Sequence, residues 1–157
     1  MATATLQSNS PEKTRKMGCI LTKGLPAGSV IVLTGPLGSG KTVFVKGMAE
    51  GLNIESDITS PSYTIASHYE GDLPLSHIDL YRTGTDEELE LLGFEELSDT
   101  RGITAIEWGE KAAGFLDEST ITVSITIGED GERTFAISNI EGAVKRKLEE
   151  ALPETGE

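Results

Sequence analysis

The sequence predicts a single α/β domain over residues 1–157. The first reason is that strand-like and helix-like stretches alternate along the chain, as is typical of this class. The second is that residues 35–42 read G-P-L-G-S-G-K-T, a complete G-x-x-x-x-G-K-S/T phosphate-binding loop, which joins a strand to a helix. The third is the alternating apolar stretch at 120–127, whose turn and returning strand predict an antiparallel hairpin. The length suits one domain with its own core.

The N-terminal part is expected to form a helix after a short polar segment. Residues 1–9 are small and polar, and they fit either a loose arm or an edge strand. Ser10 and Pro11 are typical of the N-cap and the first position of a helix, which we expect to run to Lys23. Gly24 then ends this helix.

The phosphate-binding sequence has the flanks that its motif requires. The apolar run 30–33 predicts a buried strand directly before it. Residues 42–52 predict a helix directly after it, with Val43, Met48 and Leu52 facing the core. The order of strand, glycine-rich loop and helix is what distinguishes a nucleotide site from an ordinary glycine-rich turn.

The middle of the chain predicts a hairpin and short helices. Residues 63–69 alternate apolar and polar side chains, and 73–81 form a second strand after the turn at 71–72, antiparallel to the first. Residues 85–92 begin with a capping-box pattern and predict a short acidic helix. Residues 94–98 fit one further helical turn.

The C-terminal third predicts a buried strand, a hairpin and a final helix. Residues 103–108 form a compact apolar strand that ends in an acid, and 109–115 fit a short helix. The hairpin pairs 120–127 with 132–137. An amphipathic helix is expected at about 140–152, which leaves residues 153–157 as a tail.

Composition bounds the setting of the protein. The chain carries 13 basic and 26 acidic residues, a net charge of −13, which argues against binding nucleic acid unaided. Cys19 is the only cysteine, so an internal disulfide is excluded and a reducing, cytoplasmic location is expected. No apolar run approaches the length of about 18 residues that spans a bilayer, and the first residues do not resemble a secretory signal.

The chemistry of the loop follows from its residue types. Gly35, Gly38 and Gly40 allow the backbone to curl so that N–H groups point at an anion beside a helix N-terminus. Lys41 brings a positive charge to the β- and γ-phosphates, and the Thr42 hydroxyl is placed to bind Mg²⁺. The predicted nucleotide contacts along this stretch are Gly35, Gly38, Ser39, Gly40, Lys41, Thr42 and Val43.

Two acids compete for the metal. Asp79 and Glu107 each lie at the end of a predicted strand, where a P-loop ATPase needs a carboxylate, and the pattern before Glu107 is the more apolar. Arg82 fits either a phosphate contact or an ion pair with Asp79. Trp108 fits a core position or the border of the site. The sequence lacks an Asn-Lys-x-Asp guanine motif, which argues against a GTPase.

Four stretches, in this order and spacing, resemble the bacterial TsaE family, also called YjeE. These are the phosphate-binding loop, Ser60-Pro-Ser-Tyr63, His77-Ile-Asp-Leu-Tyr-Arg82 and Ile106-Glu-Trp108, and the resemblance covers roughly residues 10–140. It implies a P-loop NTPase-like mixed sheet with flanking helices. It also implies a Mg²⁺-dependent ATPase that converts ATP to ADP, is weak alone, acts with the TsaB and TsaD proteins in tRNA N6-threonylcarbamoyladenosine formation, and meets tRNA only through that complex.

The resemblance also implies residue roles. Lys41, Asp79 and Glu107 are the candidate catalytic residues, and Thr42, Glu107 and Asp79 are the candidate metal ligands. Further nucleotide contacts are expected from the residues Ser62, in a switch-like loop, Arg82 and Trp108. The chain departs from the family pattern at Pro36, where an Asp is common, and at Ser62, where a Thr is common.

Two other functions compete with this one. The first is an ATP-gated binding module with negligible hydrolysis, in which the segment 60–63 changes order when ATP binds. The second is a small-molecule kinase that uses Asp79 as a base, although the sequence shows no acceptor pocket or lid. The use of a non-hydrolysable ATP analogue separates the first of these from an ATPase.

Overall fold

The computed structural model describes residues 1–58, 66–80 and 101–152. In this part of the chain seven strands form one sheet in the order β1-β7-β6-β2-β5-β4-β3. The strands are β1 (Ala2–Ser8), β2 (Val30–Thr34), β3 (Ala66–Tyr69), β4 (Leu75–Asp79), β5 (Ile103–Glu107), β6 (Ile121–Ile127) and β7 (Arg133–Ile140). The helices are α1 (Pro11–Lys23), α2 (Lys41–Gly51), the 3-10 helix η1 (Gly109–Phe115) and α5 (Gly142–Ala151).

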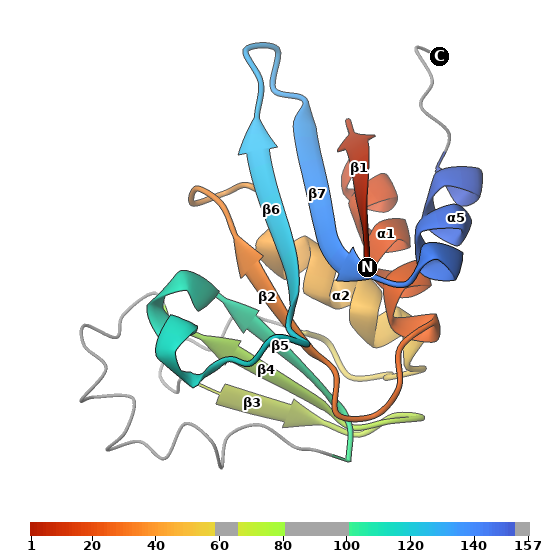
Figure 1. The fold of residues 1–157 in the computed structure, drawn as a ribbon, viewed down its shortest axis with the longest axis vertical. Coiled ribbons are helices and arrows are strands. Elements are labelled where there is room, and N and C mark those ends of the chain that lie inside the picture. The colour runs from red at the N-terminus through yellow and green to blue at the C-terminus, as the bar shows by residue number, and fades with distance from the viewer. Residues whose placement is uncertain (59–65, 81–100, 153–157) are drawn as a thin grey trace.

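The sheet is mixed, as expected. Four neighbouring strands, β6, β2, β5 and β4, run parallel to one another. The outer pairs are antiparallel: β3 with β4, β7 with β6, and β1 with β7. The C-terminal hairpin β6–β7 and the hairpin β3–β4 are therefore both confirmed. Helices α1, α2 and α5 lie on one side of the sheet, and η1 lies on the other (Figure 1).

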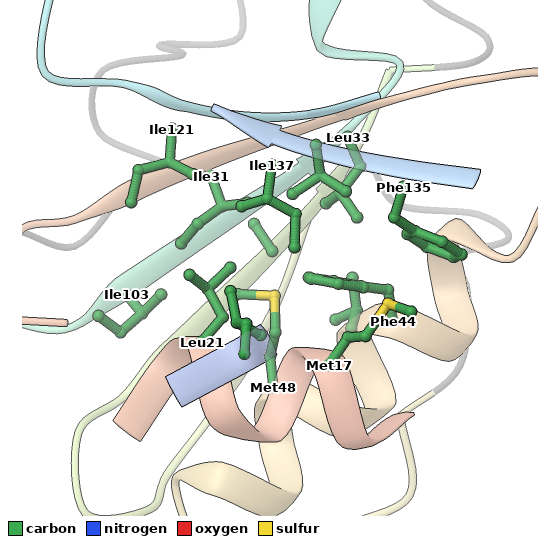
Figure 2. Packing of buried hydrophobic residues seen from close by; sticks show 14 of the residues in the cluster. Met17, Leu21, Ile31, Leu33, Phe44, Met48, Ile103, Ile121, Phe135 and Ile137 are labelled. Carbon is green, nitrogen blue, oxygen red and sulfur yellow. The ribbon is translucent and has the colours of Figure 1, made fainter. Parts of the chain in front are cut away.

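The central strands are buried on both faces. Along β2, Ile31 and Leu33 face the main core under α1, α2 and α5, whereas Val32 faces a smaller cluster with Ile78 and Ile106. This explains why β2 reads as a continuous apolar run instead of an alternating one. Met17, Leu21, Phe44 and Met48 from the helices meet the sheet in the main core, as Figure 2 shows.

The N-terminal segment is an edge strand. Residues Ala2–Ser8 pair with β7 and bury Ala4 and Leu6, so the alternative of a loose arm is wrong. Helix α1 has the expected bounds. The Ser10 hydroxyl accepts a hydrogen bond from the Lys13 N–H at 3.2 Å, as an N-cap does.

The core face of α2 differs from the expectation in one position. Phe44 and Val45 are fully buried and Val43 is only half-buried. Phe44 and Met48 are four residues apart and share a helix face, whereas Val43 is five residues from Met48 and lies off that face. Met48 and Leu52 are buried as expected. The ring of Phe44 stacks on Phe135 with centroids 5.9 Å apart, which joins α2 to the hairpin.

Several element bounds also differ from the expectation. Strand β7 runs on to Ile140, so the last helix begins at Gly142, and the short helix 109–115 is of the 3-10 type. The predicted helices at 85–92 and 94–98, and residues 63–65 of the first hairpin strand, lie outside the described residues. No helix in the described ranges has the length and apolarity to cross a membrane.

Candidate nucleotide and metal site

Three parallel strand ends meet at one edge of the sheet. Glu107 at the end of β5 pairs in register with Leu33 of β2 on one side and with Asp79 of β4 on the other. The glycine-rich loop, residues 35–42, leaves β2 at this same edge. Carboxyl ends of parallel strands are where α/β folds place their ligand sites. The fold therefore brings the loop and both candidate acids together.

The loop has the backbone conformation that its glycines permit. Gly35, Gly38 and Gly40 have φ angles of 150°, 77° and 111°, a region that favours glycine. A Cβ at Gly35 would lie 2.9 Å from the Ile125 carbonyl oxygen of β6, so the start of the loop is also packed too closely for a larger residue. Gly40 is the N-cap of α2. The first N–H groups of a helix have no acceptor within the helix, and a helix N-terminus of this kind favours an anion.

Lys41 is held over the loop. Its Nζ donates to the carbonyl oxygens of Gly35 and Pro36, at 2.6 and 3.0 Å. The same Nζ lies 3.9 Å from the ring centroid of Trp108, which has a left-handed φ of 60°. Burial lowers the pKa of Lys41, and the carboxylates of Glu107, Glu110 and Asp79 oppose that shift.

Glu107 links the loop to the neighbouring strand. The Thr42 hydroxyl donates to its two carboxylate oxygens at 2.9 and 3.1 Å. His77 Nε2 lies 2.6 Å from Oε2 of the same carboxylate. His77 and Glu107 are 0% and 3% exposed, so this carboxylate is shielded from water. Asp79 is half-buried, and its backbone pairs in register with Glu107.

The residues present fit a Mg²⁺ ion. A hydroxyl and a carboxylate in contact supply the oxygen donors that Mg²⁺ prefers, and this ion commonly keeps several waters and phosphate oxygens as its other ligands. No group of three or more His, Cys, Asp or Glu side chains suited to a metal occurs in the described residues.

The other predicted site residues divide into three groups. The Ser39 side chain is fully buried, and its hydroxyl has no hydrogen-bond partner. Val43 is half-buried on α2. Ser62 and Arg82, predicted to contact the nucleotide, lie outside the described residues.

Sequence reasoning missed two side chains at this site. The sequence assigned His77 no role in the site, and its contact with Glu107 depends on the parallel pairing of β4 with β5. Arg133 at the start of β7 donates from Nη2 to the Gly38 carbonyl at 3.1 Å. It follows an acidic turn 95 residues after the loop, and no local pattern distinguishes it from a surface arginine.

Comparisons with known proteins agree on one family. Residues 8–135 match the family model described as threonylcarbamoyl adenosine biosynthesis protein TsaE. The tRNA threonylcarbamoyladenosine biosynthesis protein TsaE of Treponema pallidum is 41% identical over 131 residues, 83% of this chain and 97% of that protein. The Bacillus subtilis protein of the same name is 34% identical over 142 residues, 90% and 89% of the two chains. The crystal structure of Bacillus subtilis YdiB superposes with a TM-score of 0.74 at 29% identity, covering 95% and 93%.

Proposed function

The chain belongs to the TsaE family of threonylcarbamoyl adenosine biosynthesis proteins, and on this premise we propose that it binds and hydrolyses ATP with Mg²⁺ for that pathway. The names of its relatives connect them with threonylcarbamoyladenosine in tRNA. The observation that carries the ATPase proposal is the hydrogen bonding of the Thr42 hydroxyl to the Glu107 carboxylate. Thr42 directly follows Lys41, whose ammonium is bound to the glycine-rich loop.

The loop is proposed to bind the triphosphate. The N–H groups at the start of α2 and the Lys41 ammonium would stabilise the negative charge of the phosphates. Lys41 is preorganised because two carbonyls and the Trp108 ring hold it in place. A charge that is already oriented stabilises the developing negative charge of phosphoryl transfer without reorganisation.

Thr42 and Glu107 are proposed to hold the metal, and Asp79 to orient water beside it. A bound Mg²⁺ would neutralise charge on the phosphate oxygens. Glu107 is suited to its role because Thr42 and His77 fix both its carboxylate oxygens. Asp79 pairs in register with Glu107 on the neighbouring strand β4, so both residues lie at the same edge of the sheet.

The partners are proposed to be the TsaB and TsaD proteins. A chain of net charge −13 is poorly suited to bind tRNA directly, because like charges repel. Contact with tRNA is therefore proposed to run through the complex. The same charge suits recognition of a basic protein surface, which steers association.

The first test measures Mg²⁺-dependent binding of ADP and hydrolysis of ATP by the purified chain, with and without TsaB and TsaD. Lys41→Ala is expected to weaken nucleotide binding at least about tenfold, since it removes a charged phosphate contact. Thr42→Ala and Glu107→Gln are expected to raise the Mg²⁺ concentration needed for turnover. Glu149→Gln, an exposed change of the same kind on α5, is the matched control and is expected to behave as the parent chain.

The same experiments distinguish an ATPase from an ATP-gated binding module without hydrolysis. If the three variants hydrolyse ATP as the parent chain does, the proposed site is wrong. If a non-hydrolysable ATP analogue supports full tRNA modification in the reconstituted system, nucleotide binding alone is the function. Stimulation of hydrolysis by TsaB and TsaD would support the proposal in full.

A further inference from the structure

Arg133 reaches the glycine-rich loop from a distant part of the chain. It is the first residue of β7, directly after the hairpin turn, and its Nη2 donates to the Gly38 carbonyl at 3.1 Å. The side chain also lies along the loop. A Cβ built on Gly40 would be 3.9 Å from both Cδ and Nε of Arg133, which is ordinary van der Waals contact.

The arginine is directed at the loop even though acids are closer in sequence. Residues 128–132 read G-E-D-G-E, yet within the described residues Arg133 forms no ion pair with any carboxylate. Its Nε is buried and has no hydrogen-bond partner. Burying a guanidinium N–H without an acceptor is unfavourable. The packing against the loop keeps it there and indicates a role beyond that of a solvated surface charge.

The hydrogen bond of Arg133 completes the fixing of one peptide unit. The Gly38 carbonyl and the Ser39 N–H belong to the same planar peptide. The Ser39 N–H donates to the Pro36 carbonyl at 3.1 Å, and the Gly38 carbonyl at the other end of the peptide accepts from Arg133. Both ends of this peptide are therefore held, immediately before Gly40 turns the chain into α2 at a φ of 111°.

Fixing this peptide sets the direction of the N–H groups that follow. The Gly40 carbonyl accepts the first helical hydrogen bond, from the Phe44 N–H at 2.9 Å. The N–H groups at the start of α2 are those proposed to face phosphate. The net charge of −13 repels an incoming polyanion. Arg133 reduces this repulsion locally, because it places a positive charge next to the site.

We propose that Arg133 is a positioning residue of the nucleotide site, which holds the loop in its binding conformation from the hairpin and raises its affinity for a nucleoside polyphosphate. This inference rests on the proposed function only for the identity of the ligand. The claim that Arg133 orders the loop stands on its hydrogen bond to Gly38 and its position beside Gly40, and it is testable without nucleotide.

The test compares Arg133→Met, which keeps most of the stem, with Arg133→Lys, which keeps a charge and a donor. Amide hydrogen exchange of the nucleotide-free protein is measured at residues 38–41, and affinity for Mg²⁺–ADP is measured by calorimetry. Arg133→Met is expected to speed exchange of the Ser39 amide and to weaken ADP binding about tenfold, the effect of losing a charged hydrogen bond. Arg133→Lys is expected to recover most of both.

The matched control is Arg146→Met, the same change at an exposed position of α5. It is expected to leave exchange at the loop and ADP affinity unchanged. The positioning role also predicts that kcat at saturating ATP stays within about twofold in Arg133→Met, since a fully bound loop regains its conformation.

Three results would overturn the inference. One is unchanged exchange and affinity in Arg133→Met. Another is a large loss of kcat with unchanged affinity, because Arg133 would then act on the transition state. The third is an equal effect in Arg146→Met, which would indicate net charge alone. If the parent chain itself bound no Mg²⁺–ADP, the proposed function would fail, and the exchange measurement would still decide the role of Arg133.

Discussion

At the scale of single residues, Glu107 is the centre of the candidate site. It is buried and accepts hydrogen bonds from Thr42 on the loop and from His77 on the neighbouring strand. A buried carboxylate is unfavourable unless its oxygens are paired, and Thr42 and His77 supply the hydrogen bonds that pair and orient Glu107. A hydrogen bond from a neighbouring donor fixes the orientation of a carboxylate that binds a metal, and metal sites in proteins generally have such a donor.

His77 therefore carries the first prediction at this scale. His77→Leu removes the donor to Glu107 and is expected to raise the half-saturating Mg²⁺ concentration for ADP binding about 10- to 100-fold. His77→Gln, whose amide can donate to the same carboxylate, is expected to lose much less. His68→Leu changes an exposed histidine of β3 and is the control. Equal Mg²⁺ dependence in all four proteins would show that His77 has no part in orienting Glu107.

The second prediction at this scale concerns Trp108. Its ring lies 3.9 Å from Lys41 Nζ, and such a contact contributes on the order of 0.5–2 kcal/mol. Trp108→Leu is expected to weaken Mg²⁺–ADP binding by a factor of about 2 to 30, and Trp108→Phe by less, because the smaller ring still has a π face. Calorimetry measures both affinities. If the Phe and Leu variants bind equally well, the contact between ring and ammonium does not contribute.

At the scale of elements, helices α1 and α2 approach unusually closely. A Cβ at Gly47 of α2 would overlap the backbone of Arg15 in α1, and a Cβ at Gly18 of α1 would overlap the Phe44 carbonyl of α2. The backbones of the two helices are thus in close contact. Because α2 begins at Lys41, this packing also determines where the loop ends.

Gly47→Ala tests this packing. It is expected to destabilise the fold by about 1–3 kcal/mol, because the helices must separate to admit the methyl group. That corresponds to a fall in Tm of roughly 2–4 °C per kcal/mol for a chain of this size. Gly142→Ala, at the first position of α5 where a Cβ meets nothing within 4 Å, is the control and is expected to be neutral or stabilising. An unchanged Tm for Gly47→Ala would contradict the close approach.

At the scale of the whole molecule, negative charge is the dominant feature. The net charge of −13 spreads over a chain of 157 residues, and self-repulsion of this kind opposes the compact state. The candidate site nevertheless carries local positive charge, because Lys41 and Arg133 both donate hydrogen bonds to carbonyls of the loop. We therefore propose that a polyanion binds beside these two cations, in a molecule whose net negative charge otherwise repels it.

Salt dependence tests the effect of this charge on stability. Raising NaCl from 10 to 150 mM shortens the Debye length from about 30 Å to about 8 Å, so repulsion between distant carboxylates is screened. The Tm in thermal unfolding is expected to rise by a few degrees over this range. KCl is expected to act equally, which would exclude a specific ion effect. A constant or falling Tm would show that the acidic surface is arranged without net repulsion.

The sequence by itself determined the features that depend on neighbours within a few residues. Ser10 and Pro11 specified the start of α1, the apolar run 30–33 specified β2, and the alternation at 120–127 specified the hairpin. The glycines also predicted the conformation of the loop, because their positive φ angles are a requirement of the local backbone. Capping, periodicity and turn chemistry are local, so the residues that encode them are adjacent in the chain.

Only the tertiary structure decided which distant side chains meet. The sequence left Asp79 and Glu107 open, and the pairing of β5 between β2 and β4 brought Glu107 to the Thr42 hydroxyl and to His77. It equally determined that residues 2–8 form an edge strand on β7 and that Arg133 reaches the loop. These contacts join residues between 30 and 138 positions apart, as from His77 to Glu107 and from Ala2 to Ile140. They depend on strand order, which no short stretch of sequence encodes.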